Sequence, residues 1–125
     1  MPLKDRVRFL KTAEDADAFL EACPKAVVFK AGACHKTQDT FARVEGHLEA
    51  HVGLAVGVIR VVESRAASQR VVEITGIRHE SPQIVLFSDR RAVFERNNWS
   101  ITSEAVGDAL QDHFAEVPNP REVVS

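Results

Sequence analysis

The chain has 125 residues, enough for one domain with a hydrophobic core. A formal net charge of −2 gives no basic surface for nucleic acid, and no apolar run is long enough to span a membrane. The first residues lack the apolar stretch of a signal peptide, and two cysteines do not make a disulfide framework. We therefore expect a cytoplasmic protein with reduced thiols, and neither nucleic acid nor a membrane as a partner.

The first half of the chain alternates helical and strand patterns. Residues 12–15 form a capping box in which Asp replaces the usual Glu or Gln, and they open a helix that ends at Pro24. Its apolar positions follow at helical spacing: Ala16, Phe19, Leu20 and Cys23. Residues 25–31 and 54–62 are short, valine-rich runs typical of buried strands, and the amphipathic pattern of 35–51 predicts a helix between them.

The second half contains a helix, a hairpin and a last helix. Residues 64–77 predict a helix, and residues 83–87 and 92–96 predict strands joined by a turn at 88–90. Thr102 can cap the last helix, whose inward face repeats at Ala105, Val106, Ala109, Leu110 and His113. The expected order is helix, strand, helix, strand, helix, strand, strand, helix.

This order predicts the fold. A helical crossover joins the first two strands, which implies that they are parallel, whereas a tight turn joins the last two as an antiparallel hairpin. A four-stranded mixed sheet with helices on both faces satisfies these connections, and that is the plan of the thioredoxin fold. We expect one thioredoxin-like α/β domain over residues 1–117, with a flexible tail over residues 118–125 that contains two prolines.

Cys34 is the leading candidate for chemistry. It follows strand 25–31 and opens the next helix, and ligands collect at the carboxyl ends of parallel strands in such sheets. Unpaired N–H groups and the positive end of the helix favour the thiolate, which is the reactive form. His35 and Lys36 add positive charge nearby, and the hydroxyl of Thr37 can hydrogen-bond the thiolate. The alternative is an inert, partly buried cysteine.

Cys23 is not the expected resolving partner. It continues the apolar face of the first helix and precedes the strand that Cys34 follows, which puts the two thiols on the order of 20 Å apart. A disulfide needs Cα atoms within about 7 Å. We therefore expect Cys23 to pack in the core, and Cys34 to act alone if it acts at all.

The segment before the third predicted strand is a second candidate. His79 and Glu80 form a polar pair beside the Ser81–Pro82 bond. Base rates favour a trans bond here. A cis bond facing the thiol loop would expose the backbone of Ser81 to an extended substrate, so both forms remain open.

Two other features carry less weight. His47 and His51 have the spacing of helical zinc ligands but lack an evident third ligand, so no metal site is expected. Trp99, the only tryptophan, is expected to pack in the core or at a sheet edge rather than to act as a binding platform.

Residues 77–83 carry a family resemblance. Their sequence, IRHESPQ, resembles the V-x-H-E-S-P-Q run of the YtxJ-like monothiol bacilliredoxins. Residues 62–68 and 98–102 are similar to that family's entries into the preceding and the last helix. The family usually reads T-C-P-I-S around its cysteine, whereas this chain reads A-C-H-K-T in a loop one residue shorter, with His35 in place of proline and Thr37 in place of serine.

The resemblance implies a thioredoxin-like fold with a cis proline at Pro82 and one redox-active cysteine at Cys34. It implies an enzyme that removes bacillithiol, or a related low-molecular-weight thiol, from protein mixed disulfides. Bacillithiol would be a co-substrate, with no cofactor bound, and S-thiolated proteins would be partners of a monomer or weak homodimer. The loop of His79, Glu80, Ser81 and Pro82 would hold the substrate.

Two other functions stay open. Some single-cysteine proteins of this fold hold an iron–sulfur cluster between two subunits, although residues 34–37 read C-H-K-T rather than the C-G-F-S of those proteins. The chain could also be a redox-inert interaction module.

Overall fold

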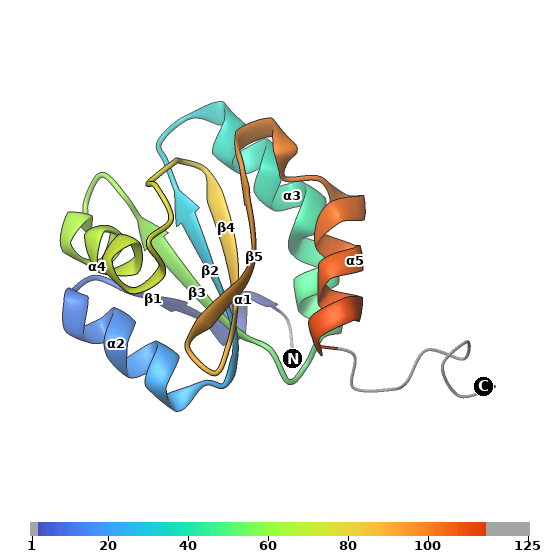
Figure 1. Cartoon of the computed structure of the whole chain (residues 1–125). Coiled ribbons are helices and arrows are strands. Elements are labelled where there is room, and N and C mark those ends of the chain that lie inside the picture. Colours follow the sequence, from blue (N-terminus) through green and yellow to red (C-terminus); the bar gives the residue numbers. More distant parts are fainter. Residues whose placement is uncertain (1–2, 115–125) are drawn as a thin grey trace.

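The computed structural model describes residues 3–114, and the expected tail at 118–125 lies outside this range. A central sheet lies between two layers of helices (Figure 1). The helices are α1 (Leu3–Arg6), α2 (Ala13–Ala22), α3 (His35–Ala50), α4 (Arg65–Thr75) and α5 (Ser103–Phe114), with a 3₁₀ turn η1 (Asn98–Ser100). The strands are β1 (Val7–Phe9), β2 (Lys25–Ala31), β3 (Ala55–Arg60), β4 (Gln83–Ser88) and β5 (Arg91–Asn97). Over residues 3–114, no helix combines the length and apolarity that a bilayer crossing needs.

The sheet has five strands in the order β1-β3-β2-β4-β5. Strands β1, β3 and β2 are parallel, while β4 runs antiparallel to β2 and β5 antiparallel to β4, so the expected crossover and hairpin are confirmed. The prediction of four strands was wrong by one, because β1 was missed. A strand of three residues is too short to show an alternating pattern. It forms because the free edge of β3 offers it a partner, with Val7 opposite Val56 and Phe9 opposite Val58.

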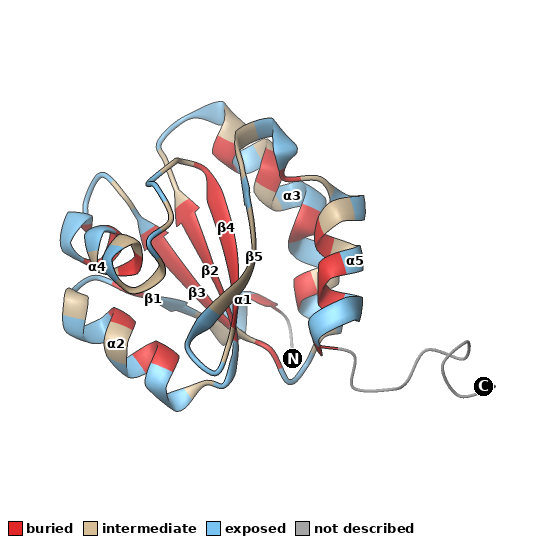
Figure 2. Cartoon of the chain, in the orientation of Figure 1, coloured by how far each residue is buried: buried red, intermediate tan, exposed pale blue. Residues whose placement is uncertain are grey.

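The core lies on both faces of the sheet, as the buried strands in Figure 2 show. Successive side chains of a strand point to opposite faces. On β2, Val27 and Phe29 join the cluster under α3 and α5, whereas Ala26 and Val28 join the cluster under α2 and α4. Burying a side chain such as Phe29 contributes roughly 1.5–3 kcal/mol. A strand buried on both faces explains the continuous apolar run that identified it.

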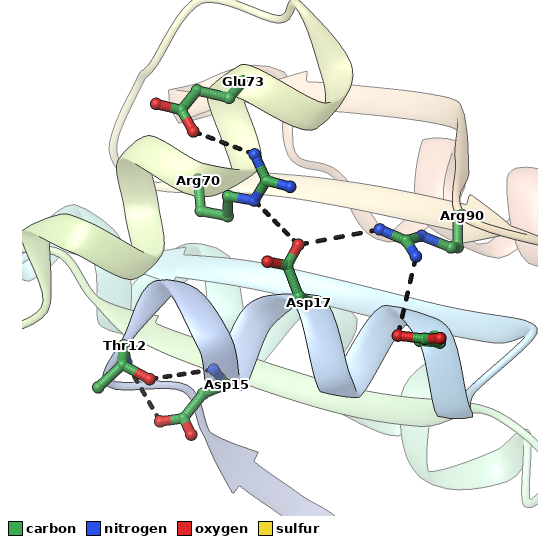
Figure 3. A network of polar contacts seen from close by, with 7 residues as sticks. Thr12, Asp15, Asp17, Arg70, Glu73 and Arg90 are labelled. Carbon is green, nitrogen blue, oxygen red and sulfur yellow. Dashed lines mark hydrogen bonds and ion pairs between the residues drawn. The ribbon is translucent and has the colours of Figure 1, made fainter.

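The capping box at the start of α2 is confirmed. Thr12 Oγ1 accepts a hydrogen bond from the backbone N–H of Asp15 at 3.0 Å, and Asp15 Oδ2 accepts from the N–H of Thr12 at 3.1 Å (Figure 3). The carboxylate of Asp15 also accepts from the N–H of Lys11 at 3.0 Å. These bonds, that of Lys11 first and then that of Thr12, hold the pKa of Asp15 below its usual value.

Polar contacts join the two helices on that face of the sheet. Arg70 of α4 contacts Asp17 of α2 at 2.9 Å and Glu73 at 3.2 Å, and Arg90 of the hairpin turn lies 3.8 Å from the same Asp17 (Figure 3). These side chains are a third or more exposed, so each pair is worth only a fraction of a kcal/mol, on the order of 0–1. They orient α2, α4 and the hairpin more than they stabilise them.

The hairpin turn is tighter than expected. Asp89 and Arg90 both have positive φ, at 49° and 68°, so the turn consists of two residues and the strands extend to Ser88 and Arg91. Two left-handed residues give the twist that matches the flanking strands. The hairpin carries β5 back to η1, which brings η1 to the same end of the sheet as the start of α3 (Figure 1).

Candidate functional site

Cys34 is the N-cap residue of α3 and is exposed. It follows β2 at the carboxyl end of the parallel strands, as the sequence predicted. Its side chain makes no capping hydrogen bond. The sulfur is therefore accessible, at the end of the helix that carries unpaired backbone N–H groups.

The backbone of the first turn favours the thiolate form of Cys34. The N–H of Thr37 has the largest effect in lowering the pKa of the Cys34 thiol below its ordinary value, and the Thr37 hydroxyl and the N–H of Lys36 add to it. Partial desolvation of the thiol acts in the opposite direction. Thr37 Oγ1 lies 3.9 Å from Cys34 Sγ and accepts the N–H of Gly32 at 3.0 Å. With that acceptor position filled, the hydroxyl proton of Thr37 is free to point at the sulfur.

The two basic side chains after the cysteine have other partners. His35 Nε2 lies 3.0 Å from Asp39 Oδ2, one helical turn along α3. Lys36 Nζ donates to Asn98 Oδ1 at 3.2 Å and lies 5.8 Å from the centre of the Trp99 ring. Among residues 3–114, the side chain in contact with the sulfur is therefore that of Thr37, and the lowering of the Cys34 pKa comes from this residue and from backbone N–H groups.

The Ser81–Pro82 bond is cis and lies against the thiol loop. A Cβ placed on Gly32, two residues before Cys34, would lie 2.6 Å from Ser81 Oγ. A side chain at this position would have to displace the Ser81 hydroxyl, because the two loops touch there. The trans form favoured by base rates is wrong, and the sequence had no local signal for the choice beyond the family resemblance.

Asn98, a residue that the sequence analysis did not single out, connects both loops. Its backbone N–H donates to Pro82 O at 2.9 Å, its side-chain oxygen accepts from Lys36, and its Nδ2 lies 3.5 Å from Glu80 Oε2. Its φ of 50° is a conformation that asparagine adopts more readily than most residues. The only sequence feature that could have indicated this role is the pair of asparagines that follows a predicted strand.

Trp99 does not lie in the core, which was one of the two placements expected for it. It is 51% exposed, with the guanidinium of Arg43 at 5.2 Å and the ammonium of Lys36 at 5.8 Å from its ring centre. The 3₁₀ turn η1 holds it outside the core cluster, beside α3. Trp99 therefore presents a half-exposed indole beside α3, within cation–π distance of two basic side chains.

Comparison with known proteins identifies the family. The family model described as monothiol bacilliredoxin BrxC matches residues 8–106. The chain belongs to the monothiol bacilliredoxin family. No curated protein matches the chain significantly.

Solved structures agree on the fold of this bacilliredoxin family member. One that is described as having a thioredoxin fold has a TM-score of 0.77 at 19% identity, covering 85% of this chain and 95% of the other. A mutant thioredoxin from Halobacterium salinarum has a TM-score of 0.70 at 23% identity, with 91% and 96% covered. Thioredoxin O2 from Arabidopsis thaliana has a TM-score of 0.73 at 9% identity, with 91% and 99% covered. The family and the fold together identify the chain as a member of the thiol–disulfide oxidoreductases.

This bacilliredoxin relative also carries a buried lysine that the sequence analysis passed over. Lys30, on β2, is fully buried, and its Nζ lies 3.3 Å from His79 Nδ1. A lysine inside an apolar strand run was a signal, because lysine is almost never fully buried without a partner. The predicted loop residue His79 is thereby tied to the sheet, while Glu80 contacts Asn98 instead.

The remaining candidates lie away from the thiol. Cys23 is the C-cap of α2, half-buried at the other end of β2, and it packs on the cluster under α2 and α4. His47 contacts Ser103 Oγ at 2.9 Å. Within residues 3–114, no three His, Cys, Asp or Glu side chains gather as a metal site would need.

Proposed function

We propose that this chain removes bacillithiol, or a related low-molecular-weight thiol, from protein mixed disulfides through Cys34 alone. One observation carries the proposal: an exposed thiol with a lowered pKa lies at the start of α3, against a cis-proline loop and at the opposite end of β2 from Cys23. A thiolate in such a position can attack the disulfide of a substrate that reaches the start of the helix.

The first step transfers the small thiol. The Cys34 thiolate attacks the bacillithiol sulfur of the mixed disulfide, a new S–S bond forms between Cys34 and bacillithiol, and the substrate protein leaves as a thiolate that takes up a proton. The second step regenerates the enzyme. A free bacillithiol thiolate attacks the bacillithiol sulfur bound to Cys34, so that bacillithiol disulfide is released and the Cys34 thiolate is restored. Each step exchanges one S–S bond for another, so no external electron carrier is needed within the cycle.

The residues around Cys34 have separate roles in this proposal. Thr37 and the backbone N–H groups of the first turn of α3 stabilise the thiolate when Cys34 acts as nucleophile and as leaving group. His35 and Lys36 would act at longer range, since their side chains contact Asp39 and Asn98. The backbone of Ser81, before the cis Pro82, would pair with an extended substrate segment.

Intact mass spectrometry tests the proposal. The reduced protein is mixed with a bacillithiolated model peptide, and wild type, Cys34→Ser and Cys23→Ser are run together. We expect a bacillithiol adduct and a released peptide with wild type and Cys23→Ser, and neither with Cys34→Ser. Equal loss in both variants would contradict the assignment to Cys34. A Cys34 that alkylates no faster than a free peptide thiol, with no transfer, would favour a redox-inert interaction module.

A further inference from the structure

The ammonium group of Lys30 is a buried charge without a counter-ion. The side chain lies on the α2 and α4 face of β2, and none of it is exposed. Among residues 3–114 its only hydrogen-bond partner is His79 Nδ1, at 3.3 Å, and no carboxylate pairs with it. Burying an unpaired charge is costly, so such groups gather at functional sites. Lys30 also lies only four residues before Cys34, at the thiol end of the sheet.

Lys30 and Ser68 determine which nitrogen of His79 carries the proton. Ser68 Oγ lies 3.2 Å from His79 Nδ1, the same atom that faces Lys30 Nζ. An ammonium group can only donate, so Nδ1 must accept and the ring proton must be on Nε2. Burial, followed by the positive charge of Lys30, lowers the pKa of His79, while the carboxylate of Glu80 opposes this. His79 is thus a neutral ring whose outer Nε2–H is a hydrogen-bond donor without a partner in the described chain.

The ring of His79 lines a cavity of about 450 Å³ at the start of α4. The other lining residues are Val61, Val62, Arg65, Ser68 and Gln69. The Arg65 guanidinium has no hydrogen bond or ion pair with any residue of 3–114. The lining of the cavity therefore includes an arginine and a neutral histidine, and no acidic residue of the described chain lines it. Such a donor set suits a carboxylate, which accepts charge-assisted bonds from arginine.

This cavity lies at the carboxyl end of the parallel strands, where α3 begins with Cys34, because its lining residue Val61 donates its backbone N–H to Ala31 O at the end of β2 at 3.0 Å. The Ser81 side chain touches the loop before Cys34, and His79 is only two residues before Ser81. In the sheet, Lys30 lies opposite Gln83, so both loops reach the same end (Figure 1). A small molecule joined through sulfur to Cys34 is therefore at the end of the sheet where His79 and Arg65 also lie.

We propose that His79 and Arg65 form a carboxylate-binding subsite for the low-molecular-weight half of the mixed disulfide, and that Lys30 is the positioning residue that keeps His79 a donor. This inference rests on the proposed function, since it names what holds the small thiol there. The subsite requires that the low-molecular-weight thiol carry a carboxylate. Thiols without an acid group, such as cysteamine, do not meet this requirement.

Binding of an unreactive probe tests the subsite without redox chemistry. S-methylated bacillithiol, which bears carboxylates, is titrated into Cys34→Ser protein with ¹⁵N-labelled histidine, and S-methylcysteamine is titrated in parallel. We expect the first probe to shift the His79 ring signals and the second to leave them in place. Arg65→Gln should weaken binding of the first probe about tenfold. Arg91→Gln, which removes the same charge at the other end of β4 and β5, is the matched control and should leave binding unchanged.

Lys30→Met tests the positioning role. The ¹⁵N shifts of His79 should report the Nε2–H form in wild type and a mixture of the two neutral forms in Lys30→Met, with weaker probe binding. A merely structural role of Lys30 would leave the ring tautomer as it is. An unchanged ring tautomer in a folded Lys30→Met variant would overturn this part of the proposal.

A competition between substrates separates the subsite from the proposed function. Wild type should transfer bacillithiol from a model peptide faster than cysteamine, and Arg65→Gln should lose most of that preference while still transferring cysteamine. Transfer with the preference intact in Arg65→Gln would overturn the subsite and leave the function standing. Probe binding at His79 without any transfer would overturn the function and leave the subsite standing.

Discussion

The contact between Gly32 and Ser81 leads to a quantitative prediction for Gly32→Ala. The added Cβ would lie 2.6 Å from Ser81 Oγ and 3.3 Å from Thr37 Oγ1. The backbone of Gly32 is not in the left-handed region, so the collision and not the backbone conformation is the cause. Overpacking of this kind typically costs about 1–3 kcal/mol. We expect the free energy of unfolding to fall by that amount in urea denaturation followed by circular dichroism.

A double-mutant cycle with Ser81→Ala checks the cause. The Ser81 hydroxyl oxygen is buried and has no hydrogen-bond partner in the described chain, so removing it should be close to neutral. The remaining Ser81 Cβ would lie 3.8 Å from the new methyl group, an ordinary contact. Only the 3.3 Å approach to Thr37 is left, and Gly32→Ala should then cost less than about 1 kcal/mol. The same cost in both backgrounds would refute the reasoning that the two loops touch at this point.

Three further predictions concern single groups. Burial lowers the pKa of Lys30 from 10.5 to about 8. Between these two pH values the unfolded state binds more protons than the folded state. The free energy of unfolding of wild type should therefore rise with pH across this window, by on the order of 3 kcal/mol. Urea titrations at pH 7 and pH 10 should show that rise in wild type and lack it in Lys30→Met; parallel curves would contradict the lowered pKa. Thr12→Ala should cost about 1 kcal/mol through loss of the cap. Because the pKa of Asp15 is lowered in the folded state, its contribution to the free energy of unfolding is present above the unfolded pKa and is lost as pH falls through the folded pKa. Acid titration should show a smaller loss of stability in Thr12→Ala than in wild type. Thr37→Val should raise the pKa of Cys34, which the pH dependence of iodoacetamide alkylation in a Cys23→Ser background measures; an unmoved midpoint would rule out the role of the hydroxyl.

The linear pattern determined the helices α2 to α5, the central strands and the place of Cys34, but it did not indicate α1 or η1. The apolar runs of β2, β3 and β4 are buried on both faces, and that burial is what makes such runs visible in a sequence. The capping box at Thr12 and the hairpin turn depend on residues next to each other, so they too were predictable. The position of Cys34 at the carboxyl end of β2 followed from element order alone.

Contacts between distant segments decided the rest. β1 exists because β3 has a free edge, and the environment of the sulfur is set by backbone groups of α3 rather than by the basic side chains beside it. Asn98 and His79 come to the thiol end of the sheet only through the antiparallel return of β4 and β5. The burial of Lys30 beside His79 depends on β2 and the loop before β4, which are far apart in sequence. The alternation of polar and apolar residues records which face of an element is buried, but it does not record which polar groups meet at the end of a sheet.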